Sequence, residues 1–354
     1  MTPVDIKYGF PLFTKRESTN FIVKTNKLRI SDIWAFWDYI IRKFCSRTSK
    51  KLPEKEFLLT LLEQAKYFYI AADQAPIKSK PLLYYYSFLN LAKIIINFET
   101  FHGKTGEYNH GIETKVNATT TISSAIATIK ALSGSTKISV ANEFAKAMGD
   151  NFAAYPVHLN IKTMLNSCIG IHRSFSETYN TTEYYYRLSE IAMYKHGCKL
   201  FSRAKIKNCD DGVMAQLTAA GYNVKKIESN NQTSYFWQEY INMARNSINR
   251  ESIYNLSNKL ILQGIGSYTN GDEYRMYITT NSSQKLSSAS IIYNLMFFFG
   301  SITRYQPFLF DDILTEKERW LISEFLKTQP SQFLYLVTSR VIGQEVYKTH
   351  AIGG

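Results

Sequence analysis

Three apolar patterns with helical spacing follow one another between residues 31 and 96, and they constrain the fold more than any other feature of the chain. In the first, residues such as Trp37 recur at every third or fourth position, and Asp32 supplies a cap just before them. The second begins after Pro53 and the third at Pro81, where proline suits the first turn of a helix. Consecutive helices of this kind predict a helical bundle.

The third pattern, PLLYYYSFLNLAKIII, is apolar on nearly all sides and predicts the central, most buried helix. It also carries polar groups at Tyr85, Tyr86, Asn90 and Lys93, and helical spacing places the last three along one edge. One interpretation is that the hydroxyls and Asn90 bond neighbouring backbone groups while Lys93 extends to solvent. The other is that this edge lines a pocket for an anion or a nucleotide.

The C-terminal part of the chain again has helical patterns. Residues 288–305 are apolar on most faces, Thr315 with Glu318 forms a capping signal for a second helix, and Pro330 is placed to open a third. We expect these helices to complete the bundle.

Strand signals are confined to the middle of the chain. Aromatic and β-branched stretches between residues 183 and 226 surround one helical pattern, and Asn270-Gly271 lies between alternating residues, as in a hairpin. The predicted fold class is therefore mainly α, a helical bundle core with a small β insertion, or a minor α+β character. The predicted organisation is an N-terminal arm at 1–30 and one composite domain at 31–354, with 31–111 and 286–347 as the bundle core and 112–285 as a mixed insertion.

The chain has 42 Lys and Arg against 29 Asp and Glu, a formal charge of +13, which attracts polyanions such as nucleic acid or acidic lipid. Its start lacks a secretion signal, and its apolar runs are far shorter than the roughly 20 residues that a bilayer requires. The four cysteines show no spacing typical of a disulfide framework or a zinc site. We expect a cytoplasmic protein without membrane span, metal or cofactor.

Two basic runs, at residues 42–51 and 195–207, interleave cations with aromatic or apolar side chains, as nucleic-acid surfaces often do. Solvated faces explain both runs nearly as well. The sequence alone leaves both interpretations open.

Two basic residues outside the third helix are candidates for its site. His110 precedes Gly111, which permits unusual backbone angles, so His110 is a candidate general base or phosphate ligand. Arg304-Tyr305 ends an apolar helix, where Arg304 either caps carbonyl groups or contacts the same anion as Lys93. We predict a cleft in which the polar edge of the third helix faces His110 and Arg304, with Tyr305 among the binding residues.

A set of short motifs repeats the pattern of a known family. They are Pro81-Leu82-Leu83, Tyr85-Tyr86, Leu89-Asn90-Leu91-Ala92-Lys93, His110-Gly111, Ser301, Arg304-Tyr305 and Pro307. This set resembles the YaaC-like family of bacterial proteins over roughly 34–111 and 291–346, with a divergent middle. Some relatives look like components of phage-defence loci, so the resemblance implies a defence-type role.

Paired tyrosines on a helix followed by a His-Gly loop are also similar, more distantly, to the first half of HEPN-type helical bundles, which include many toxin and defence ribonucleases. Their cleavage site is an Arg followed four to six residues later by a His. No His follows Arg245-Asn246 or Arg304 at that spacing. The departure counts against RNA cleavage by the usual HEPN pair and leaves His110 with Arg304 as the catalytic candidates.

Three functions are compatible with these patterns. The first is a nucleic-acid- or protein-binding module of an anti-phage defence-type system, with a partner protein from the same operon. The second is a ribonuclease-like toxin that uses His110 and Arg304, and the third is a structural scaffold subunit. No Walker loop, dinucleotide-binding turn or serine-hydrolase elbow occurs in the sequence.

Overall fold

The chain divides into two compact units. We call Met1–Arg29, Glu183–Lys285 and Ile342–Tyr347 the sheet unit, and Ile30–Thr182, Leu286–Val341 and Lys348–Gly354 the helical unit. The computed structural model describes residues 2–3, 28–47, 52–99, 107–131, 137–150, 152–182, 185–219, 221–229, 232–243, 256, 265–267, 274–277, 286–314, 316–342 and 346–348.

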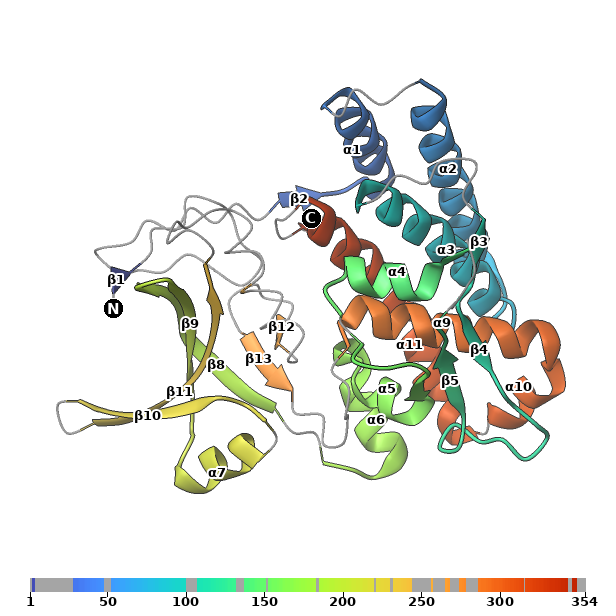
Figure 1. Cartoon of the computed structure of the whole chain (residues 1–354). Coiled ribbons are helices and arrows are strands. Elements are labelled where there is room, and N and C mark those ends of the chain that lie inside the picture. Colours follow the sequence, from blue (N-terminus) through green and yellow to red (C-terminus); the bar gives the residue numbers. More distant parts are fainter. Residues whose placement is uncertain are drawn as a thin grey trace, which may run out of the picture. The chain divides into compact units, whose positions relative to one another are not determined.

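The helical unit is built on long helices with short strands between them (Figure 1). Its described helices are α1 (Ile33–Arg47), α2 (Leu52–Gln74), α3 (Lys80–Glu99), α4 (Val140–Ala147), α5 (Ile161–Asn166), a 3-10 turn at Ile169–Ile171, α6 (His172–Tyr179), α9 (Ser288–Tyr305), α10 (Pro307–Ile313) and α11 (Glu316–Ile342). Its short strands are β3 (Tyr108–Asn109), β4 (Ile112–Thr114), β5 (Ile126–Ile129), β6 (Ile138–Ser139) and β7 (Val157–Asn160).

Helix α3 is the central helix of this unit, as its sequence predicts. It packs against α2, α4 and α9, and most of its side chains are buried (Figure 1). Phe88 of α3 stacks on Phe333 of α11 with ring centroids 3.9 Å apart, and both side chains are fully buried. Gly300 of α9 lets that helix approach closely, because a Cβ there would lie 3.3 Å from the Leu82 Cα atom. The apolar faces of α3 and α9 therefore form the core that positions the site.

The predicted helix starts agree with the structure at α1 and α2. Asp32 caps α1 by accepting hydrogen bonds from the backbone amides of Trp34 and Ala35, each at 3.0 Å. The structure corrects the prediction at Pro330, which lies inside α11 and does not open a new helix. Buried residues on both sides of Pro330, among them Phe325 and Phe333, pack the two halves into one core and offset the lost hydrogen bond. The capping signal at Thr315 lies outside the described residues.

The sheet unit contains a seven-stranded antiparallel sheet whose main path runs β10-β11-β9-β8-β13-β12, with β1 paired to β8. Its elements are β1 (Thr2–Pro3), β8 (Tyr185–His196), β9 (Lys199–Ile206), α7 (Asp211–Ala219), β10 (Val224–Ser229), β11 (Gln232–Asn242), β12 (Ile265–Ser267) and β13 (Tyr274–Tyr277). Strands β2 (Leu28–Ile30) and β14 (Val346–Lys348) form a separate pair. Strands β12 and β13 pair as the Asn270-Gly271 signal predicts, although that turn itself lies outside the described residues.

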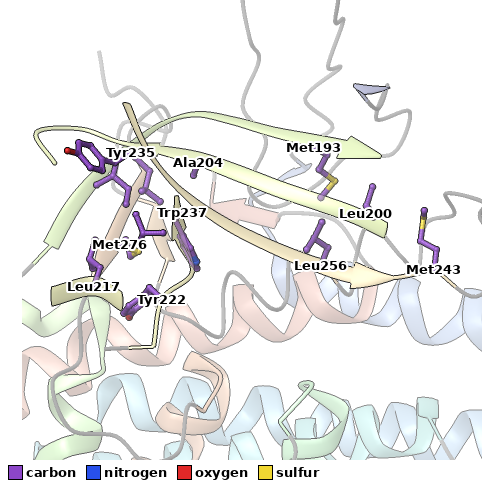
Figure 2. Close-up of a cluster of buried hydrophobic side chains, with 13 residues drawn as sticks. Met193, Leu200, Ala204, Leu217, Tyr222, Tyr235, Trp237, Met243, Leu256 and Met276 are labelled. Carbon is purple, nitrogen blue, oxygen red and sulfur yellow. The ribbon is translucent and has the colours of Figure 1, made fainter. Parts of the chain in front are cut away.

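One face of the large sheet carries the core of its unit. Trp237 and Met276 are fully buried there, beside Leu217 and Tyr222 from α7 and the loop after it (Figure 2). Every second residue of β9 faces this core, so Leu200, Ser202 and Ala204 are buried while Phe201 and Arg203 point to the opposite face.

The prediction of a mainly α fold, a helical bundle core with a small β insertion, is wrong. The seven-stranded sheet and the smaller sheet β4-β5-β7 make the chain α+β. The strand signal of β9 is weak in the sequence because its inward positions include Ser202 and Ala204, which are buried but only weakly apolar. In addition, residues 112–182 lie in the helical unit, although their pattern groups them with the insertion.

No helix within the described ranges has both the length and the apolar character needed to cross a bilayer.

Candidate anion-binding site

A hollow of about 300 Å³ opens in the helical unit where α3, β4 and α9 meet. A second hollow of about 480 Å³ adjoins it and shares Thr114, Ser301 and Tyr305 with it. The first is lined by Leu82, Tyr85, Tyr86, His110, Ile112, Glu113, Thr114, Phe297, Gly300, Ser301, Arg304 and Tyr305. Its size is at the lower end of the range for small-ligand pockets, which suits a compact group.

Tyr85 and His110 form the inner wall of this hollow. The Tyr85 hydroxyl contacts the Nδ1 atom of His110, and both rings lie against Phe297, with centroids 5.2 and 6.2 Å from it. Burial raises the pKa of Tyr85 well above its ordinary value, so the hydroxyl keeps its proton. The contact holds the Nδ1 side of the His110 ring.

The backbone around His110 explains how the ring is held. The His110 carbonyl accepts from the Ala141 amide at 3.0 Å, and the Asn109 side chain accepts from the Gly111 amide at 2.9 Å. Gly111 has φ +70°, and a Cβ there would lie 1.8 Å from the Ser139 Oγ atom. Only glycine fits this left-handed, crowded position, as the sequence indicates.

Arg304 enters the hollow from the last turn of α9. Its Nη1 atom donates to the Tyr86 hydroxyl at 2.8 Å, and its guanidinium lies 5.0 Å from the centroid of the Tyr305 ring. The side chain is exposed, and no carboxylate of a described residue forms an ion pair with it. Arg304 therefore presents a positive charge at the hollow and does not serve as a helix cap.

The environment of His110 favours its neutral form. Partial burial lowers the pKa of His110, and the positive charges of Lys93 and Arg304 lower it further. An anion bound between these groups would reverse that effect by stabilising the imidazolium. The same electrostatics that keep His110 neutral in the free protein thus favour a negatively charged ligand.

Lys93 acts on His110 from outside the hollow. Its ammonium is 5.3 Å from the centroid of the Tyr108 ring, and burial lowers its pKa. The Asn97 Nδ2 atom fixes Tyr108 by donating to its hydroxyl at 2.7 Å. Lys93 therefore adds positive potential at the site without lining the hollow.

Hydroxyl groups and one ion pair complete the outer wall. The hydroxyls of Thr114 and Ser301 lie 3.2 Å apart at the junction of the two hollows. The Glu113 carboxylate pairs with Lys130 at 2.6 Å, so its negative charge is offset. Donors and cations thus outnumber acceptors around the space.

Most of the predicted site residues are brought together. Tyr85, Tyr86, His110, Arg304 and Tyr305 line one hollow, and Lys93 acts on His110 electrostatically.

Asn90 does not reach the hollow. Its Nδ2 atom instead donates to Gln64 of α2 at 3.3 Å, which is a structural role. Sequence reasoning misses Thr114 as a lining residue, since nothing in its surroundings marks it. Ser301 is identified from the sequence only as part of a family motif. It lies one helical turn before Arg304, and this spacing indicates that the two side chains lie on the same side of the helix.

A family model described as "YaaC-like Protein" matches residues 35–341 of the chain. A search of curated proteins and a search of solved structures found no significant match. The more distant similarity to HEPN-type bundles is not shown by these comparisons.

Proposed function

Since this chain belongs to the YaaC-like protein family, we propose that it is a nucleic-acid-binding module of a bacterial anti-phage defence-type system, and that its hollow holds a terminal phosphate. The observation that carries this proposal is the position of Arg304, a cation without a carboxylate partner among the described residues, beside His110 and two hydroxyls.

Phosphate fits the donors of the hollow better than other common anions. A guanidinium offers a planar fork for two phosphate oxygens, while a protonated His110 ring and the Ser301 hydroxyl offer further donors. Binding would also raise the pKa of His110 and so strengthen the attraction. A neutral sugar or an apolar ligand would bring no negative charge to pair with the Arg304 guanidinium.

Two features favour nucleic acid over a free phosphate ion. The Tyr305 ring is 65% exposed beside Arg304, where a base adjoining a bound phosphate can stack on it. The formal charge of +13 adds a general attraction for polyanions. We propose that the protein binds nucleic acid in the cytoplasm, together with a partner protein encoded in the same operon.

The test compares two 3′-labelled RNA octamers that differ only in a 5′-phosphate. We expect the phosphorylated RNA to bind about tenfold more tightly in fluorescence anisotropy, because one charge-assisted contact is worth about 1.5 kcal/mol. Arg304→Ala removes the difference. Arg173→Ala is the matched control, since Arg173 lies on α6 and pairs with Glu177 at 2.8 Å. Equal binding of the two RNAs by the unchanged protein would overturn the proposal.

One arrangement favours a second candidate, a ribonuclease-like toxin. His110 and Arg304 line the same hollow, so a base and a cation are available to one scissile phosphate. This candidate predicts that expression alone harms the cell, that His110→Ala relieves the harm, and that purified protein cleaves RNA without added metal. Intact RNA after prolonged incubation, together with harmless expression, would exclude it.

A further inference from the structure

We infer that the sheet unit carries a second, separate site: the face of the large sheet opposite its core, which binds single-stranded nucleic acid. Among the described residues, the hydrophobic core of the unit lies on one face of the sheet (Figure 2). Antiparallel register then fixes which side chains share the other face. We call this face the basic face, and its aromatic and positively charged residues are Tyr194, Lys199, Phe201, Arg203, Lys205, Lys225, Phe236 and Tyr240.

The register lines these residues up across four strands. Lys225 of β10 pairs with Phe236 of β11, and Phe236 pairs with Lys205 of β9. Further along β9, Phe201 lies between Tyr240 of β11 and Tyr194 of β8. Aromatic and basic residues are therefore interleaved across the face.

The two faces differ in charge, because acidic and basic residues are mixed on the opposite face. At the paired positions of β8 to β11 within the described residues, the basic face has no Asp or Glu. The nearby acids Glu228 and Glu239 belong to the opposite face, where Glu239 accepts from the Trp237 indole at 3.1 Å. Neighbouring Lys226 also faces that side and pairs with Asp211 of α7 at 3.0 Å. A surface with only one sign of charge is suited to a polyanion.

The cations are already placed on aromatic rings. The Arg203 guanidinium lies 5.3 Å from the Tyr194 centroid and 5.3 Å from the Phe236 centroid, and its Nη2 atom donates to Gln238 at 3.4 Å. The Lys199 ammonium lies 4.8 Å from the Tyr240 centroid. Such sites combine a ring for a base with a positive charge for the adjoining phosphate.

Single strands fit this face better than a duplex. Tyr240 and Lys199 are exposed, while Phe201, Arg203 and Phe236 are half-buried, so the rings offer flat surfaces and do not project far. Unpaired bases can stack on such rings, whereas bases in a duplex are stacked on one another. Sequence preference is expected to be weak, because stacking accepts every base.

The test uses a labelled 5′-hydroxyl oligothymidine of about 12 nucleotides, within the usual range of single-strand site sizes, which lacks the terminal phosphate that the hollow requires. We expect salt-dependent binding, a weaker signal with the matching duplex, and a loss of about fivefold or more for Tyr240→Ala. The sharpest comparison is Lys225→Ala against Lys226→Ala, which remove the same charge from adjacent residues on opposite faces. We expect Lys225→Ala to weaken binding about threefold and to lower the salt slope by about one ion, and Lys226→Ala to leave both near wild type.

Two results would overturn the inference. One is equal effects of Lys225→Ala and Lys226→Ala, which would indicate attraction by net charge alone. The other is loss of binding by Arg304→Ala with Tyr240→Ala unchanged, which would assign the strand to the hollow. Circular dichroism of each variant checks that the sheet is folded. Because the probe has no 5′-phosphate, failure here leaves the phosphate site of the helical unit untouched.

Discussion

The hollow in the helical unit and the basic face of the sheet unit present positive charge in opposite ways. In the hollow, Arg304 and His110 are held by tyrosine hydroxyls and surround a small concave space. On the sheet, Arg203 and Lys199 lie on aromatic rings spread over several strands. The first arrangement suits one compact anion and the second suits an extended chain. The formal charge of +13 therefore predicts the kind of ligand only when the groups around each cation are known.

We expect the largest effect from core substitutions, which test whether each unit can be destabilised without the other. Phe88→Ala removes a fully buried ring stacked on Phe333, so it should destabilise the helical unit by about 3–5 kcal/mol. Hydrogen exchange should quicken in α3 and α9. Trp237→Ala is the reciprocal variant and should quicken exchange in β9 and β11. If either variant loosened both units equally, the separation would be wrong.

The next effect concerns the turn that holds His110. Gly111→Ala combines a positive φ with a clash against Ser139, so it should cost roughly 1–3 kcal/mol and reduce selectivity for the 5′-phosphate. Gly149→Ala is the control, because Gly149 has φ +94° but a Cβ added there would meet nothing within 4 Å. A larger loss of stability for Gly111→Ala, by thermal unfolding, isolates the cost of the close approach. Equal losses of stability for the two variants would show that the close approach of Ser139 to Gly111 adds no cost.

A smaller effect is expected where Arg304 is oriented. Tyr86→Phe deletes the hydroxyl that accepts from Arg304 but keeps the ring, so the preference for the 5′-phosphate should fall about fivefold, in line with about 1 kcal/mol for one hydrogen bond. Binding of 5′-hydroxyl oligothymidine should not change, because the basic face is intact. A parallel decline for both ligands would show that the two sites are not independent.

The smallest effect is a dependence of stability on pH. The folded state lowers the pKa of His110, so the unfolded chain binds the proton more readily. Stability from this group is complete above the unfolded pKa of about 6.5 and declines as the pH falls below it. Solvent screening of the exposed ring keeps the change in Tm below about 2 °C. His110→Gln should flatten this part of the pH profile, whereas an unchanged slope would assign it to other groups.

Much of the site could be predicted because helical spacing is readable. Tyr85 and Tyr86 could be placed on a central helix, and Arg304 at the end of another apolar helix. Lys93 and Tyr86 share an edge but lie about 10 Å apart along the helix axis, since each residue rises about 1.5 Å. One hollow therefore cannot include both ends of that edge, and Asn90 between them turns to Gln64.

The sheet was harder to predict because its pairing is long-range and its pattern is weak. Strand β9 alternates Lys199, Phe201, Arg203 and Lys205 with Leu200, Ser202, Ala204 and Ile206, and two of the four buried positions are small or polar. The basic run could be seen in the sequence. Its division between two faces requires the register of β9 with β8 and β11.

The most direct test of the account is a titration of His110 by NMR, with and without a 5′-phosphorylated dinucleotide. The ring protons of His110 report its pKa, which is lowered in the free protein by burial and by the charges of Lys93 and Arg304. We predict that the phosphorylated ligand shifts these signals and raises the pKa of His110, and that the 5′-hydroxyl dinucleotide does neither. Identical titration curves in all three samples would contradict a phosphate site at this hollow.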